Sequence, residues 1–151
     1  MKIKIEIDKS IAEDEIIIRT REMTEEILEL ENLLTSFMKK KLEIKFFKDD
    51  TEYFLKFEDI LFFQTEVNLV YGHTKDDAYL VKHKLYELEE ILPIYFIRIS
   101  KSTIVNLKEI SSLKRNLGSV STITFYDSHK INYVSRHYYK IFKEKLEEIK
   151  L

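Results

Sequence analysis

The 151-residue sequence contains no cysteine, no tryptophan, one proline and two glycines. Without cysteine the chain can form no disulfide, no thiolate zinc site and no thiol nucleophile. Gly72 and Gly118 are too few for a dinucleotide-binding fingerprint and too far apart for a phosphate-binding P-loop. No apolar run approaches the ~18–20 residues of a membrane span, and the first ten residues alternate in charge where a signal peptide is apolar. We therefore expect a soluble, cytoplasmic protein.

Residue patterns for catalysis or metal binding are also missing. None of the four histidines has the spacing of a metal-binding motif: His73, His83, His129 and His137. The paired carboxylates Asp49–Asp50 and Asp76–Asp77 fall where turns are expected, so we interpret them as turn residues rather than acid–base pairs. With no nucleophile beside a base, the sequence predicts no enzyme, no catalytic residue, no metal, no cofactor and no small-molecule substrate.

The chain contains enough apolar and aromatic residues for a packed core. Hydrophobic residues make up 44 % of the sequence, with ten phenylalanines and nine tyrosines. A chain of this length holds one ordinary domain, or one domain with an appendage. We expect no extensive disorder.

The first forty residues predict a small β-β-α extension. Ile3, Ile5 and Ile7 alternate with charged residues, which is typical of a half-buried strand, and residues 16–19 predict a second one. A helix follows, which Thr24 can cap. Its apolar stripe consists of Met23, Ile27, Leu30, Leu34 and Phe37. The stripe is too apolar to stay in water, so we expect residues 1–40 to dimerise or to dock on the rest of the chain.

Residues 42–151 predict a second unit made mostly of short strands. Turns are expected at the two aspartate pairs named above, and a helix over residues 85–92 should end before Pro93. Ser135 can cap a last helix. The fold class predicted for the chain is therefore mainly β with short helices (α+β).

Positive charge gathers in one stretch of the chain. The whole sequence has 25 cationic and 27 acidic side chains, but residues 95–143 have nine cationic side chains and two acidic ones, a net charge of +7. Such a surface attracts polyanions such as nucleic acid. Charge alone leaves a second interpretation open, in which the stretch is an ordinary solvated face.

Four blocks of sequence stand out in the second unit. The central block over residues 95–110 reads YFIRISKSTIVNLKEI. The other three blocks are FEDILFFQTE at 57–66, KLYELEEIL at 84–92 and INYVSRHY at 131–138. Together they resemble the LytTR family of bacterial DNA-binding domains, and the central block is similar to the family signature. The blocks occur in the family's order and at compatible spacing, and the resemblance covers about residues 42–149.

The resemblance implies an elongated antiparallel β-fold whose loops enter successive major grooves of double-stranded DNA. It implies a transcriptional regulator in which Lys101, Arg136 and Asn68 contact bases. Ser102 and Ser135 would accompany them on phosphates. Lysine and arginine suit this role because they donate to guanine O6 and N7.

Further positions follow from the residues themselves. We expect Lys114, Arg115 and Lys140 to touch phosphates only. Arg98 alternates with Ile97 and Ile99, so it either clamps the backbone or adds a phosphate contact. Asn106 follows a strand and is expected to close a turn with its side chain.

Partners are implied by the same resemblance. Only about 40 residues precede the DNA-binding part, without the pattern of a receiver domain, which is similar to the family's stand-alone branch. For that branch the resemblance implies control by a partner, often a small membrane protein, and we expect a homodimer. The alternative function is a protein-interaction or single-stranded nucleic-acid module that uses exposed aromatic side chains for stacking.

Overall fold

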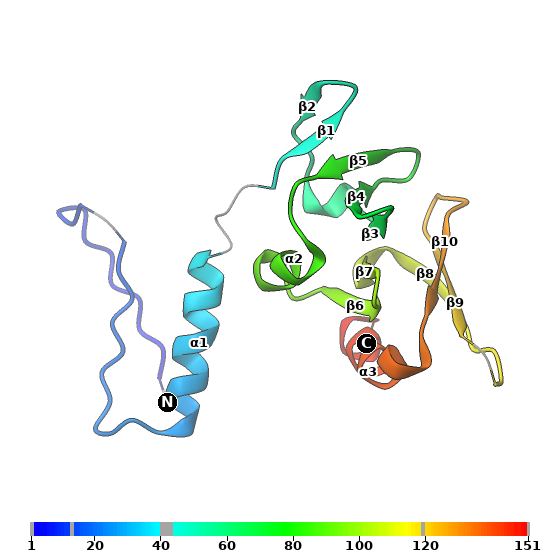
Figure 1. The fold of residues 1–151 in the computed structure, drawn as a ribbon. Coiled ribbons are helices and arrows are strands. Elements are labelled where there is room, and N and C mark those ends of the chain that lie inside the picture. Colours follow the sequence, from blue (N-terminus) through cyan, green and yellow to red (C-terminus); the bar gives the residue numbers. More distant parts are fainter. Residues whose placement is uncertain (1, 13, 40–43, 119, 151) are drawn as a thin grey trace.

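The computed structural model describes residues 2–12, 14–39, 44–118 and 120–150 (Figure 1). Its elements are α1 (Glu25–Lys39), β1 (Phe46–Lys48), β2 (Thr51–Tyr53), β3 (Phe62–Glu66), β4 (Leu69–His73), β5 (Ala78–Val81), α2 (Leu85–Ile91), β6 (Phe96–Ser100), β7 (Thr103–Asn106), β8 (Ile110–Lys114), β9 (Ser121–Phe125), β10 (Ile131–Val134) and α3 (Arg136–Lys150). The strands form a seven-stranded sheet in the order β2-β1-β5-β4-β3-β7-β6 and a three-stranded sheet in the order β10-β9-β8. Every described strand pair is antiparallel, which confirms the predicted fold class.

Strand β3 separates two hydrophobic cores. Successive side chains of a strand point to opposite faces of the sheet. Phe62 and Phe63 are nevertheless both buried, because each face of the sheet is covered by a core. Phe63 belongs to the core that α2 covers through Leu88. Phe62 belongs to the other core, which the three-stranded sheet and Phe142 of α3 close. The continuously apolar run at the start of β3 therefore reflects burial on both faces of the sheet.

Two tight turns join neighbouring strands through residues with positive φ. Asp49 and Asp50 have φ angles of 50° and 60° between β1 and β2, and Val67 and Asn68 have 46° and 66° between β3 and β4. Two-residue hairpin turns with both φ angles positive match the twist of the flanking strands. The turn predicted at Asp49–Asp50 is confirmed, as is the end of α2 before Pro93.

The N-terminal segment differs from the prediction. Helix α1 is present, and the backbone N–H of Ile27 donates to Thr24 Oγ1 (3.3 Å), as expected of a cap. Within one chain, neither residues 2–8 nor residues 16–19 form a strand, so the two strands of the predicted extension are not formed in the single chain. Alternation shows only which side chains share a face, whereas a strand also needs a hydrogen-bonding neighbour.

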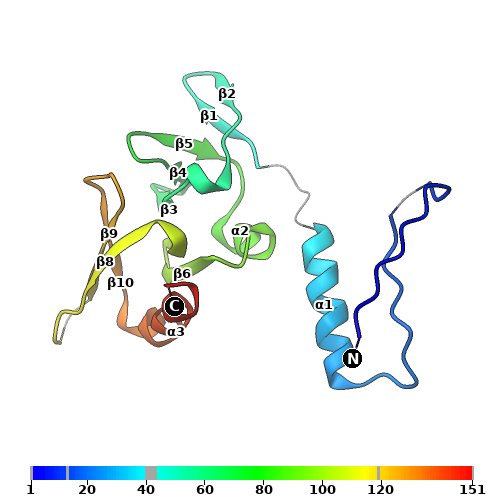
Figure 2. The same ribbon diagram turned by 180° about the vertical axis from the view of Figure 1, so that it is seen from behind.

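Residues 2–22 extend away from the sheets, with α1 between them and the domain (Figures 1 and 2). Within the predicted stripe of α1, Ile27, Leu30 and Leu34 are half-buried, while Met23 and Phe37 are exposed. The boundary that we predicted at residues 40–42 lies outside the described residues. No described helix is long and apolar enough to cross a membrane, α1 and α3 having 15 residues each.

Candidate nucleic-acid interface

Two backbone hydrogen bonds place three of the predicted DNA-contacting segments at one end of the seven-stranded sheet. The N–H of Thr65, in β3, donates to the carbonyl oxygen of Ser102 (2.8 Å), so the turn with Lys101 lies beside the β3–β4 hairpin. The N–H of Ser135 donates to the carbonyl oxygen of Ile99 (2.9 Å), which holds the start of α3 against the strand that leads into the same turn. Asn68, Lys101 and Arg136 are therefore presented by neighbouring loops.

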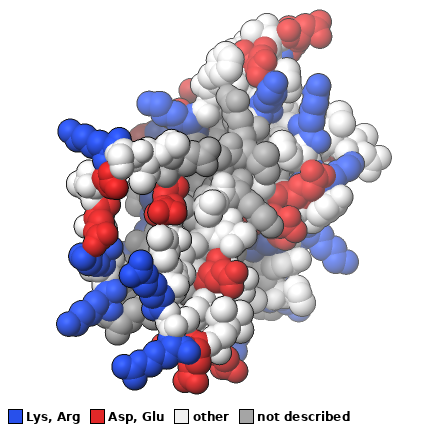
Figure 3. All heavy atoms as spheres, turned by 90° about the vertical axis from the view of Figure 1, so that its left-hand side faces the viewer, with Lys and Arg blue, Asp and Glu red and all other residues white. Residues whose placement is uncertain are grey.

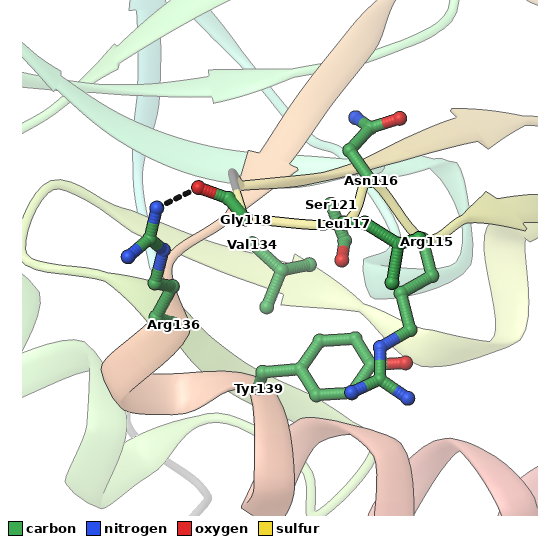
Figure 4. Close-up of a pocket in the computed structure, with 8 residues that line it drawn as sticks. All are labelled: Arg115, Asn116, Leu117, Gly118, Ser121, Val134, Arg136 and Tyr139. Atoms are coloured by element: carbon green, nitrogen blue, oxygen red, sulfur yellow. Dashed lines mark hydrogen bonds between the residues drawn. The ribbon is translucent and has the colours of Figure 1, made fainter.

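A fourth segment joins them through Arg136, whose side chain donates to the carbonyl oxygen of Gly118 in the β8–β9 loop. A pocket of about 270 Å³ lies between this loop and the start of α3. Arg136 and Arg115 lie on opposite sides of it, with Tyr139 between them (Figure 4). The guanidinium carbon of Arg115 is 5.2 Å from the centre of the Tyr139 ring, a cation–π arrangement.

Arg98 clamps the turn that carries Lys101. Its Nε donates to the carbonyl oxygen of Ser100 (2.8 Å) and one terminal nitrogen donates to that of Lys101 (2.6 Å). The other terminal nitrogen pairs with Glu89 (2.8 Å). All three nitrogens thus have protein acceptors, which supports the interpretation of Arg98 as a backbone clamp. A phosphate contact by Arg98 stays a prediction.

The two predicted phosphate-binding serines differ from each other. Ser102 is half-buried, and its N–H donates to Ser100 Oγ (3.2 Å). Ser135 precedes α3, but its hydroxyl is buried without a hydrogen-bond partner among the described residues. The predicted side-chain cap is therefore wrong, because the Tyr138 N–H donates to the carbonyl oxygen of Ser135 instead (3.2 Å). Phosphate contacts by either serine stay predictions.

Two asparagines have clear local roles. Asn106 is 1 % exposed, its Nδ2 donates to the carbonyl oxygen of Ile60 (3.0 Å), and its Oδ1 accepts from the Lys108 N–H (3.0 Å). The predicted turn closure is confirmed. Asn68 is exposed and suits the positive φ of its turn, so the turn alone explains an asparagine there. A base contact by Asn68 stays a prediction.

The position of Val67 at an exposed turn was not predicted from the sequence. It is 94 % exposed at the tip of the β3–β4 hairpin, with a φ angle of 46°. A β-branched residue is strained in that region of φ and ψ. No sequence signal identifies it, since a valine normally predicts a strand.

The cations of residues 95–143 divide into two groups. Two pair with carboxylates, Arg98 with Glu89 and Lys143 with Glu147 (3.4 Å). Lys108 lies over the Tyr95 ring (4.1 Å), and Lys130 contacts His73 Nδ1 (3.3 Å) and the Asp77 carbonyl oxygen (2.7 Å). Within the described part of the chain, five further cations also have no carboxylate at ion-pair distance: Lys101, Lys114, Arg115, Arg136 and Lys140. These five belong to the loops described above or to the residues beside them, so an anion approaching this end meets uncompensated positive charge.

The side of the molecule that carries the N-terminal segment looks different. Figure 3 shows Lys and Arg interspersed with Asp and Glu on that side, with uncharged surface between them. Mixed charge of this kind does not favour a polyanion.

Comparison with known proteins agrees with this geometry. The family model of the LytTr DNA-binding domain matches residues 50–147. The chain belongs to the LytTr DNA-binding domain family. It is 31 % identical over 146 residues to an HTH-type transcriptional regulator of Staphylococcus aureus strain NCTC 8325 / PS 47, a match that covers 97 % of this chain and 98 % of that protein. A relative from strain MRSA252 has the same kind of name and coverage, at 30 % identity.

A solved structure has the same fold as this LytTr chain. The LytTr DNA-binding domain of a Bacillus cereus protein, described as a methyl-accepting/DNA response regulator, matches with a TM-score of 0.63 at 22 % identity. The match covers 68 % of this chain and 95 % of that one. The structural likeness adds the fold, whereas the general role of the LytTr chain, DNA binding in transcription regulation, rests on the family match and on the relatives.

The names of the Staphylococcus relatives include a helix-turn-helix type. In the described residues of this LytTr chain, five strands separate α1 from α2 and five more separate α2 from α3. A helix-turn-helix needs two helices joined by a short turn, so the loops are the better candidates for contact with DNA.

Proposed function

We propose that this chain is a transcriptional regulator that binds double-stranded DNA sequence-specifically, with its clustered loops in the major groove. The observation that carries the proposal is the group of five cations without carboxylate partners around those loops. Lys101 and Arg136 contact base edges. Asn68 adds a third base contact, while Lys114, Arg115 and Lys140, together with Ser102, Ser135 and Arg98, meet phosphates.

Base reading requires a side chain whose support is rigid. Lys101 meets this requirement because Arg98 holds its turn by two bonds to backbone carbonyls. Arg136 opens a helix anchored by Phe142, which is fully buried. Its bond to the Gly118 carbonyl uses one of five N–H donors and leaves others for a guanine. Lys114 is exposed at the end of β8, where a phosphate contact demands less precision.

Matched substitutions test this assignment. After selection of a cognate site from random duplexes, binding of Lys101→Ala and Arg136→Ala is compared with that of Lys114→Ala on cognate and scrambled DNA at one salt concentration. Loss of a base contact should cost about 1–3 kcal/mol on the cognate duplex only. Loss of the Lys114 phosphate contact should weaken both duplexes by the same factor. Equal losses on both duplexes for Lys101→Ala and Arg136→Ala would contradict base reading.

No observation favours the alternative of a single-stranded nucleic-acid or protein-interaction module. Its stacking surface would need neighbouring exposed aromatics, yet many phenylalanines lie in the two cores, among them Phe46, Phe62 and Phe63. The exposed ring of Phe54 follows β2, whereas that of Tyr86 lies in α2. A preference for single strands over duplexes in the same binding experiment would support the alternative.

The protein also acts as a homodimer under this proposal. Support comes from the exposed apolar side chains of the N-terminal segment and of α1, because such side chains are stabilised by burial. Control by a small membrane protein stays a prediction from the family resemblance.

A further inference from the structure

Residues Lys2–Asp8 have a pattern that is complementary to itself. The segment reads Lys-Ile-Lys-Ile-Glu-Ile-Asp. Ile5 is its centre, and the positions at equal distance on either side of Ile5 are either both isoleucine or oppositely charged. Lys4 corresponds to Glu6, and Lys2 to Asp8. A segment of this kind suits a strand that pairs with an identical strand in the opposite direction.

The structure leaves this segment without a partner. It is in neither a helix nor a strand, and Ile3, Ile5 and Ile7 are 92 %, 83 % and 89 % exposed. The Lys4 ammonium donates to the Glu6 carboxylate, so these two side chains lie on the same side of the segment. Asp8 ends it with a local turn, in which its Oδ1 accepts from the Ser10 N–H (2.9 Å). An extended segment with one apolar face offers an unpaired strand edge.

We propose that two copies of the chain associate by pairing their Lys2–Asp8 segments as antiparallel strands about a two-fold axis at Ile5. Lys4 of each copy then faces Glu6 of the other, and Lys2 faces Asp8. On the other face Ile3 meets Ile7, and the two Ile5 side chains meet at the axis. This inference rests on the homodimer of the proposed function and specifies its interface.

Other ways of pairing are disfavoured by charge. A parallel pair in register places Lys4 against Lys4 and Glu6 against Glu6, and like charges directly opposite destabilise a strand pair. An antiparallel pair shifted by two residues places either Lys4 or Glu6 against its own copy. A shift by one residue moves the isoleucines to the charged face. The register centred on Ile5 avoids all of these conflicts, and it is isologous, as a closed dimer requires.

The apolar face of such a two-stranded ribbon needs a cover, because two strands alone are marginally stable in water. The same part of the chain contains an apolar groove of about 850 Å³ between residues 14–18 and α1. Its apolar lining comes from Ile16, Ile18, Leu34, Phe37 and Met38. Figure 1 shows the extended N-terminal part of the chain running alongside α1. The isoleucines contributed by the second copy are the occupant that we assign to this groove.

Charge reversal in the full-length chain tests the pairing. Sedimentation equilibrium without DNA gives the dimer dissociation constant of the wild type, Lys4→Glu, Glu6→Lys and the double swap that combines both. Each single variant turns two attractive pairs into like-charge pairs and should weaken the dimer at least about tenfold. The double swap should restore it. A mixture of the two single variants should dimerise more tightly than either alone, because unlike copies are then complementary. Lys9→Glu is the matched control, since it makes the same charge change outside the paired stretch.

The outcomes separate this inference from the rest of the proposal. A wild-type dimer that responds to none of the charge reversals overturns the strand pairing and leaves the homodimer standing. A wild type that stays monomeric overturns both. Sequence-specific DNA binding is measured separately on the same variants, and its absence would refute the proposed function without bearing on the strand pairing.

Discussion

The domain of residues 44–150 and the segment of residues 2–39 use the same kind of side chain with opposite results. Ile99, Ile104 and Ile123 in the domain are almost completely buried, whereas Ile3 and Ile5 in the segment are exposed. Alternation is clear in the segment and in β9, where Ser121, Ile123 and Phe125 are buried and the residues between them are half-buried. The domain strands have neighbours that supply hydrogen bonds and a second layer that covers the apolar face, and the segment has neither within one chain.

The comparison shows that periodicity and burial are separate properties. A pattern of period two predicts which side chains will share a face if a second strand pairs with the segment. In the domain the partners are other strands of the same chain, held together by β3 with a core on each side. For residues 2–8 the partner that we propose is a second copy, because the charge pattern of the segment is self-complementary.

The largest difference between the regions should appear on truncating one buried and one exposed apolar side chain. Phe63 is fully buried, with its ring 6.2 Å from that of Phe46 and 5.7 Å from that of Phe96. Phe63→Ala should lower the free energy of unfolding by about 3–5 kcal/mol, because it leaves a cavity in the core. Ile5→Ala should leave it unchanged at protein concentrations below the dimer dissociation constant. Chemical denaturation measures both, and a clear loss for Ile5→Ala would show that the segment packs on the domain.

A smaller change in the free energy of unfolding should come from pH, through His73 in the domain. Burial lowers the pKa of His73 below its ordinary 6.5; the Glu66 carboxylate opposes this shift, and Lys130 adds to it. Lys130 donates to Nδ1, so the ring proton lies on Nε2 and is donated to Glu66 (2.8 Å). The native state thus prefers neutral His73.

Because the unfolded chain takes up this proton first, stability should fall as pH decreases from about 6.5 and level off below the folded pKa. The slope for one proton is at most about 1.4 kcal/mol per pH unit, and it is reduced here because the ring is partly exposed. Denaturation of His73→Gln between pH 5 and 7 should show a flatter profile. His137→Gln, which removes an exposed histidine, is the matched control. Identical profiles for wild type and His73→Gln would contradict this account.

The smallest effect should appear at the hairpin tip of the domain. Val67 has a positive φ that a β-branched residue adopts only with strain, and asparagine tolerates it. Val67→Asn should therefore raise the free energy of unfolding by about 1 kcal/mol. Thermal unfolding measures it, with Leu69→Asn as a control in the adjoining strand, where no gain is expected. A loss of stability at position 67 would show that the valine makes a contact worth more than the strain.

The sequence by itself determined the local features of this protein. Thr24 and Pro93 mark helix ends, and Asp49–Asp50 marks a turn, because each preference involves only a few adjacent residues. The family could also be predicted from the sequence, because its signature lies in short contiguous blocks. Lys101 and Arg136 lie in those blocks, and their base contacts stay a proposal.

Only the tertiary structure decided which segments are neighbours. No pattern in the chain predicts that the Thr65 N–H donates to Ser102 or that the Ser135 N–H donates to Ile99. The sequence indicated that Arg98 clamps the backbone, but only the fold identifies its acceptors, the carbonyl oxygens of Ser100 and Lys101. Nor could alternation reveal that residues 2–8 have no strand partner among the described residues of the same chain. Hydrogen-bond partners and the cover of an apolar face lie far away in sequence or on another molecule, so they are properties of the assembled fold rather than of any one stretch of residues.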